Sequence, residues 1–209
     1  MSFDKSFHQA VYLNARGRYE EAVIKFDQLI QLHPDDVEAW KKRASFHMQI
    51  QRYQNAVEDF SRILELSPDD IDILMQMGRA LTELARFEEA IDAFEKVILK
   101  YPHNIPALVS KGKALHELGR YGQAMEAFDK AVRVNPEDPE LLELNGDTLI
   151  ELGRFEEALA AFERAIQIRP NKGYLWRKKG HVLKALGRKD EMNDAYDKGY
   201  RLDCPEYSI

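Results

Sequence analysis

The sequence contains a single cysteine, Cys204, among its 209 residues. One cysteine excludes an internal disulfide framework and a metal cluster held by several thiolates. Long apolar runs are also missing, since the longest are a few residues against the roughly 20 that cross a bilayer. The N-terminus has no charged segment followed by an apolar stretch, so no signal peptide is expected. These absences predict a cytoplasmic protein without membrane insertion.

Basic residues are outnumbered, because 30 Lys and Arg stand against 36 Asp and Glu, a formal net charge of −6. Binding to nucleic acid depends on neutralising phosphates, so this balance disfavours a nucleic-acid partner. The motifs G-x-G-x-x-G, G-x-x-x-x-G-K-[ST], H-E-x-x-H and G-x-S-x-G are absent. The six histidines show no ligand spacing, whereas a zinc site needs three or four converging ligands. The sequence therefore predicts a protein that is not an enzyme and has no metal and no cofactor.

What the sequence has instead is a fixed period of 34 residues. Five of its eight prolines follow this spacing: Pro34, Pro68, Pro102, Pro136 and Pro170. A period in this range indicates a repeat architecture. Segments that begin at residues 3, 37, 71, 105, 139 and 173 align without insertion, and we number the places of each segment from its first residue. Place 8 holds Gly or Ala, place 20 holds Ala in five of six segments, and place 24 holds Phe or Tyr.

Each segment is predicted to form two helices. Apolar residues such as Ile105, Leu108 and Leu115 recur at helical spacing in the first half. A break follows, at which glycine tolerates a left-handed backbone: Gly17, Gly119, Gly153 and Gly187. Acidic pairs such as Glu88–Glu89 then stand where the dipole of a second helix favours negative charge, which we prefer to a catalytic acid/base pair. The second helix ends before the proline, and Asp35–Asp36 and Asp69–Asp70 are expected to cap the next first helix.

The small residues are expected to let the helices approach closely, and the aromatic residues to fill the space between them. Ala124 is expected at the helix crossing inside its repeat, whereas Ala161 is expected on a less crowded face. Because one helical pair cannot cover its own apolar face, stacked pairs must share a continuous core.

The pattern small–aromatic–Ala–aromatic–Pro in a 34-residue helix-turn-helix repeat resembles the tetratricopeptide repeat. Segments such as ALVSKGKALHELGRYGQAMEAFDKAVRVNP, from Ala107, carry the resemblance, which spans nearly the whole chain. It implies an all-α fold, a right-handed superhelical α-solenoid of about six helix-turn-helix units. We expect a single array over residues 1–209, with repeats at 3–36, 37–70, 71–104, 105–138 and 139–172 and a divergent C-terminal capping repeat at 173–206. Pentatricopeptide repeats, which bind RNA, share the helical-pair plan, but the acidic balance and the strict period argue against them.

The resemblance also implies a binding face. Members of the family bind extended peptides or partner helices on the concave side, where places 5, 6 and 9 of each first helix point inward. Carried over residue by residue, these places define the predicted partner-binding groove: Lys41, Lys42, Ser45, Met75, Gln76, Arg79, Val109, Ser110, Lys113, Glu143, Asp147, Arg177, Lys178 and His181. Along the array the groove is expected to be basic, then acidic, then basic, and Lys41, Arg79 and Lys113 are expected to form one exposed basic stripe.

Three functions stay open on this evidence, and the third, an enzyme or a nucleic-acid binder, is disfavoured by the absent motifs and the acidic balance. The first is a non-catalytic protein–protein interaction module whose basic stripe recognises carboxylates of a partner protein or peptide with an acidic segment, with Met75 and Val109 in apolar contact. The second is a structural scaffold that self-assembles into homo-oligomers through repeat stacking. A face that is merely solvated would show the same residues. A clamp for a C-terminal carboxylate fits poorly, since Ser45 stands where that clamp has asparagine and Val109 where it has a second lysine.

Overall fold

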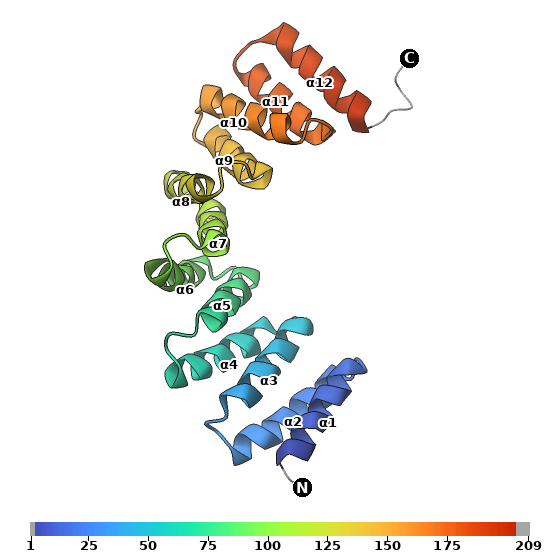
Figure 1. Ribbon diagram of the computed structural model, residues 1–209, viewed down its shortest axis with the longest axis vertical. Helices are drawn as coiled ribbons and strands as arrows, with labels where there is room; N and C mark the ends of the chain where they lie inside the picture. The colour runs from blue at the N-terminus through green and yellow to red at the C-terminus, as the bar shows by residue number, and fades with distance from the viewer. Residues whose placement is uncertain (1–2, 204–209) are drawn as a thin grey trace. The chain divides into compact units, whose positions relative to one another are not determined.

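The computed structural model describes residues 3–203, which form twelve helices and, within that range, no strand (Figure 1). The first helices of the six repeats are α1 (Phe3–Ala15), α3 (Val37–Gln49), α5 (Ile71–Glu83), α7 (Ile105–Glu117), α9 (Pro139–Glu151) and α11 (Gly173–Ala185). The second helices are α2 (Tyr19–Leu32), α4 (Tyr53–Leu66), α6 (Phe87–Lys100), α8 (Tyr121–Val134), α10 (Phe155–Ile168) and α12 (Lys189–Asp203). Every first helix begins at place 1 and every second helix at place 17, which confirms the predicted all-α solenoid of helix-turn-helix units.

The chain divides into two compact units, with the boundary between Pro102 and His103. The first unit contains α1 to α6 and the second contains α7 to α12. The two helices of each repeat pack against each other. Between repeats of the same unit, α2 packs against α3, α4 against α5, α8 against α9, and α10 against α11. The single array and the right-handed superhelix stay predictions. Cys204 and the last places of the capping repeat lie outside the described residues.

Place 8 is small because the aromatic ring of place 24 lies against its backbone. A Cβ built on Gly112 would stand 2.5 Å from Cε1 of Phe128, and one on Gly78 would stand equally close to Phe94. The phenylalanines at place 24 are among the most deeply buried side chains of the molecule. The expected pairing of small residues with aromatic rings is confirmed.

The expected contrast between Ala124, at place 20, and Ala161, at place 23, is not found. Ala124 has no exposed surface, as expected of a helix crossing. Ala161, expected on a less crowded face, is also buried, with 8% of its surface exposed. Its equivalents Ala93, Ala127 and Ala195 are buried as well, because place 23 lies beside the aromatic residue of place 24 on the core side of the second helix.

The breaks between the two helices take a left-handed backbone in every repeat. Gly17, Gly119, Gly153 and Gly187 have φ between 69° and 74°, as the sequence predicts. The other two repeats have no glycine there, and Gln51 and Ala85 adopt φ of 58° and 56° instead. These two turns were not predicted, because glycine is the residue by which the sequence marks this turn.

Replacing Ala85 with glycine is expected to raise the free energy of unfolding by about 1 kcal/mol, because a left-handed backbone strains a residue that carries a Cβ. The reverse change, Gly119→Ala, is expected to lower it by a similar amount through backbone strain alone, since nothing lies within 4 Å of the added Cβ. Chemical denaturation of both variants measures the two effects. An Ala85→Gly variant that is no more stable than the parent would contradict the assigned turn.

Side chains at the helix starts fix the boundaries. Asp36 caps α3 by accepting hydrogen bonds from the backbone N–H groups of Glu38 and Ala39, at 2.9 and 3.1 Å. The first helices α5, α7 and α9 are capped in the same way by Asp70, Asn104 and Asp138. The neighbouring aspartates of the expected capping pairs take another role, since Asp35 and Asp69 pair with Arg62 and Lys100. One aspartate of each pair is therefore the cap.

The acidic pairs belong to the starts of the second helices. An arginine occupies place 16 of all six repeats, and in four of them it forms a two-bonded ion pair with the glutamate of place 19. Arg86 donates from Nε and Nη2 to Glu89, at 2.7 Å each. The hydrogen bond from Arg86 lowers the pKa of the Glu89 carboxyl. A carboxylate that is held ionised and engaged in this way fits a helix start and not a proton-transfer pair.

Candidate functional site

The predicted groove residues of the second unit neutralise one another across α9 and α11. Lys178 Nζ donates to Glu143 Oε1 at 2.7 Å and to Asp147 Oδ2 at 2.5 Å. The hydroxyl of Tyr174, a residue outside the predicted set, donates to Glu143 Oε2 at 3.1 Å. The acidic stretch and the basic stretch that the sequence places one after the other are therefore ion-paired.

This cluster is partly withdrawn from water. Burial alone would lower the pKa of Lys178, but its hydrogen bonds to Asp147 and Glu143 outweigh burial and raise that pKa. Burial raises the pKa of Asp147, and the charge of Glu143 adds to the rise. Arg177 is compensated as well, because its guanidinium pairs with the carboxylate of Asp203 on α12.

The remaining groove residues of the second unit stay accessible. Lys113 and His181 are exposed, and Val109 and Ser110 are partly exposed. Lys113 forms no ion pair with any side chain that the structure describes. Among the predicted groove residues of the second unit, Lys113 is thus a cation without an ion pair, whereas Glu143, Asp147 and Lys178 are paired with one another.

Two groove residues of the first unit are less accessible than predicted. Met75, expected to offer an apolar contact in the groove, is 9% exposed and belongs to the core of its unit. Lys41, expected in an exposed stripe, donates to Asp70 Oδ2 at 2.7 Å, and its side chain is only 35% exposed. Asp70 is the cap of α5, and although burial opposes it, the bonds from Lys41 and the backbone lower its pKa. Lys41 therefore supports the joint between two repeats.

Four predicted groove residues of the first unit remain on its surface. Ser45 and Gln76 are partly exposed, and Lys42 lies 3.5 Å from Glu38 in a loose pair along α3. Arg79 is exposed and forms no ion pair with a side chain that the structure describes. Lys41 and Arg79 lie in the first unit and Lys113 lies in the second. Their alignment in one stripe therefore stays a prediction.

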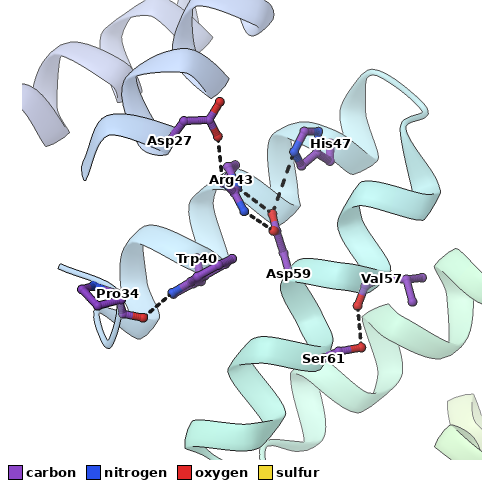
Figure 2. A network of polar contacts seen from close by, with 8 residues as sticks. All are labelled: Asp27, Pro34, Trp40, Arg43, His47, Val57, Asp59 and Ser61. Carbon is purple, nitrogen blue, oxygen red and sulfur yellow. Dashed lines mark hydrogen bonds and ion pairs between the residues drawn. The ribbon is translucent and has the colours of Figure 1, made fainter. Parts of the chain in front are cut away.

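A buried polar network joins α2, α3 and α4, and Figure 2 shows how its members lie. Arg43 donates to both oxygens of Asp59, at 3.1 and 2.5 Å, and to Asp27 of the preceding repeat at 2.6 Å. His47 Nε2 lies 3.9 Å from Asp59 Oδ2, and its Nδ1 has no hydrogen-bond partner. The guanidinium of Arg43 also lies over the ring of Trp40, 4.7 Å from its centroid.

This network was not predicted from the sequence, although the repeat contains a signal for it. His47 occupies place 11, where the five other repeats have leucine, and Asp59 occupies place 23, where the last four have alanine. The two side chains are 7% and 2% exposed, so ionisable groups replace apolar ones in the core. Burial raises the pKa of Asp59 against the opposing effect of Arg43, and burial and Arg43 lower the pKa of His47.

The lowered pKa of His47 makes stability depend on pH. An unfolded histidine titrates near 6.5, so as the pH falls through 6.5 the unfolded chain takes up a proton before the folded protein does. The free energy of unfolding therefore falls as the pH drops from 6.5 to the lower pKa that His47 has in the folded protein. Denaturation between about pH 7 and pH 5 is expected to show a smaller loss for His47→Leu than for the parent.

His103→Leu controls for the removal of an exposed imidazole. The assignment of His47 would be wrong if His47→Leu lost stability over this range as steeply as the parent does.

The paired helices of the six repeats define a class of protein, a helical-repeat protein. Two models described as tetratricopeptide repeat match the chain, one over residues 75–139 and 109–173 and the other over residues 9–77. The chain belongs to the tetratricopeptide repeat family. Repeats of this family typically form non-catalytic interaction scaffolds. A comparison with curated proteins finds no match.

Solved structures share the fold. The crystal structure of a MamA protein is 16% identical, with a TM-score of 0.77, over 83% of this chain and 96% of that one. The C-terminal part of a TPR repeat-containing protein from Cytophaga hutchinsonii is 16% identical, with a TM-score of 0.82, over 96% and 80%. YrrB, described as a TPR protein with an unusual peptide-binding site, is 20% identical, with a TM-score of 0.72, over 87% and 93%. Identities this low show the fold alone.

Two further observations concern the part of the chain that the structure describes. None of its helices has the length and apolar character needed to span a bilayer. No three His, Cys, Asp or Glu side chains in it converge as the ligands of a metal ion would.

Proposed function

We propose that this chain is a non-catalytic interaction module that binds a peptide or partner segment on the face of its first helices. The family supports a protein-interaction role in general, and YrrB is described as having a peptide-binding site on the same fold. Six repeats acting as a single array, with one groove, are part of this proposal.

The observation that carries the proposal is the uncompensated charge at place 9. Arg79 and Lys113 stand at this place in successive repeats, both are exposed, and neither has an ion pair within the described chain. Cations at places 5 and 6 of other first helices are compensated, as Lys41 on α3 is by Asp70 and Lys178 on α11 is by Asp147. A partner with carboxylates would complete the pattern, and charge complementarity would steer its approach and fix its position.

Self-assembly through repeat stacking is the alternative that the sequence left open. Light scattering coupled to size exclusion, over a series of concentrations, separates the two. The interaction module is expected to stay monomeric, whereas a scaffold would form oligomers whose mass grows with concentration.

The proposal is tested by charge reversal on a captured partner. Affinity capture from native cell extract supplies the partner, and calorimetry then measures its affinity for Arg79→Glu and Lys113→Glu. Each reversal is expected to weaken binding about tenfold or more, because repulsion replaces attraction. Binding to the parent should weaken with added salt, since charges are screened over about 8 Å at physiological ionic strength.

Matched controls come from the second helices of the same two repeats. Lys96 on α6 and Lys130 on α8 are exposed, and Lys96→Glu and Lys130→Glu change the net charge equally. Affinity should be unchanged in both. Equal losses in all four variants would mean nonspecific charge attraction, and no loss in any of them would place the binding site away from the first helices.

A further inference from the structure

The first repeat presents an apolar residue where every other repeat is polar. Place 9 holds Ser45, Arg79, Lys113, Asp147 and His181 in the later repeats, but Val11 in the first. Val11 is 37% exposed on α1. Its isopropyl group is therefore in water on the face that the proposed partner occupies, and covering it would be favourable.

Phe7, at place 5 of the same helix, lies one turn before Val11. Its ring packs edge-on against the buried ring of Phe26, with centroids 5.3 Å apart and an interplanar angle of 85°. That contact holds the ring in place, and part of the side chain stays exposed. Because residues four apart share one side of a helix, Phe7 and Val11 form a small apolar platform whose larger member is fixed by the core.

Cations continue the same face toward the third repeat. Lys42 occupies place 6 of α3 with a side chain that is 43% exposed, and Arg79 occupies place 9 of α5. Lys41 adds little net charge because Asp70 neutralises it. Among these places of the first unit, the first repeat thus carries the apolar Phe7 and Val11, whereas the second and third repeats carry the cations Lys42 and Arg79.

We propose that Phe7 and Val11 form a subsite for a bulky apolar side chain of an acidic peptide segment, whose carboxylates bind Lys42 and Arg79. Buried aromatic and aliphatic anchors usually supply most of the affinity of such an interface, while charges on its rim fix the orientation. This inference rests on the proposed function and adds the chemistry of the partner. In the bound peptide, the apolar residue is separated along the sequence from the acidic residues, because Phe7 and Val11 lie on another repeat than Lys42 and Arg79.

A random library of 12-residue peptides, displayed on phage and selected against the full chain, tests the inference. Peptides that combine acidic residues with an aromatic or branched aliphatic residue are expected to be enriched. For a selected peptide, Val11→Ser is expected to raise the dissociation constant about tenfold, since the contact with one apolar side chain is lost. Libraries selected against Val11→Ser should keep the acidic preference and lose the apolar one, and those selected against Arg79→Glu should do the reverse.

Ile24→Ser is the matched control, because Ile24 is 55% exposed on α2, a second helix. It should leave the dissociation constant unchanged. Enriched peptides without an apolar residue, or an equal effect of Ile24→Ser and Val11→Ser, would overturn the subsite and leave the proposed function intact. A selection that enriches no peptide at all would contradict both.

Discussion

Replacing Arg43 with methionine is expected to lower the free energy of unfolding by about 3–5 kcal/mol, because it strands a buried carboxylate. Asp59 is 2% exposed, and Arg43 is the cation that donates to both of its oxygens. Without Arg43 the carboxylate must either remain charged in the core or take up a proton. Guanidinium denaturation followed by circular dichroism measures the loss.

The third repeat supplies a matched variant. It carries Met77, Leu81 and Ala93 at the places of Arg43, His47 and Asp59. The triple change Arg43→Met, His47→Leu and Asp59→Ala is expected to be at least as stable as the parent, since apolar replacements of a buried ion pair are often neutral or stabilising.

Asp27, the remaining carboxylate of this network, is 44% exposed and needs no buried partner. An Arg43→Met variant as stable as the parent would show that the network is not formed. A triple variant as unstable as Arg43→Met would show that the first and second repeats need more than apolar packing to join.

Two glycines of the fourth repeat are expected to respond to alanine with opposite signs. Gly112→Ala places a methyl group 2.5 Å from the ring of Phe128, which is 1% exposed and cannot move without disturbing the core. Overpacking of this kind lowers the free energy of unfolding by about 1–3 kcal/mol. Gly122→Ala, on the exposed side of α8 with nothing within 4 Å, is expected to raise it by about 0.5–1 kcal/mol, because glycine weakens a helix.

Chemical denaturation of the two variants, compared with the parent, decides the point. The same sign for both changes would contradict the close packing of place 8 against place 24.

The period predicted the fold closely because its physical causes are local and repeated. The proline at place 32 cannot continue a helix, the polar residue at place 34 caps the next one, and small residues face aromatic ones inside each repeat. The helices accordingly begin at the same two places, 1 and 17, in every repeat. Ala85 and Gln51 escaped prediction because the surrounding repeat imposes a left-handed turn that their own side chains disfavour.

The candidate site was less predictable, because a repeat place gives the direction of a side chain but not its neighbours. Lys178 and Lys41 stand at expected groove places, yet each meets a carboxylate of an adjoining repeat. Met75 points to the core, although Val109 at the same place is partly exposed. Pairing between residues about 30 positions apart depends on how successive helices stack, which sequence spacing alone does not give.

The buried network was predictable in principle. His47 stands where five leucines recur, and a histidine inside an apolar stripe marks a polar contact in the core. The predicted core rests on places 8, 20 and 24, and place 11 is not among them. What the sequence could not supply is that Arg43 reaches Asp27 in one direction and Asp59 in the other.

Hydrogen exchange of the full chain, with and without its captured partner, tests the central claim most directly. Binding on the face of the first helices is expected to slow exchange in α3 and α5, and most strongly in the turns of helix that carry Lys42 and Arg79. The second helices α4 and α6 should exchange at the same rate in both states. Protection confined to α4 and α6, with α3 and α5 unchanged, would contradict the account.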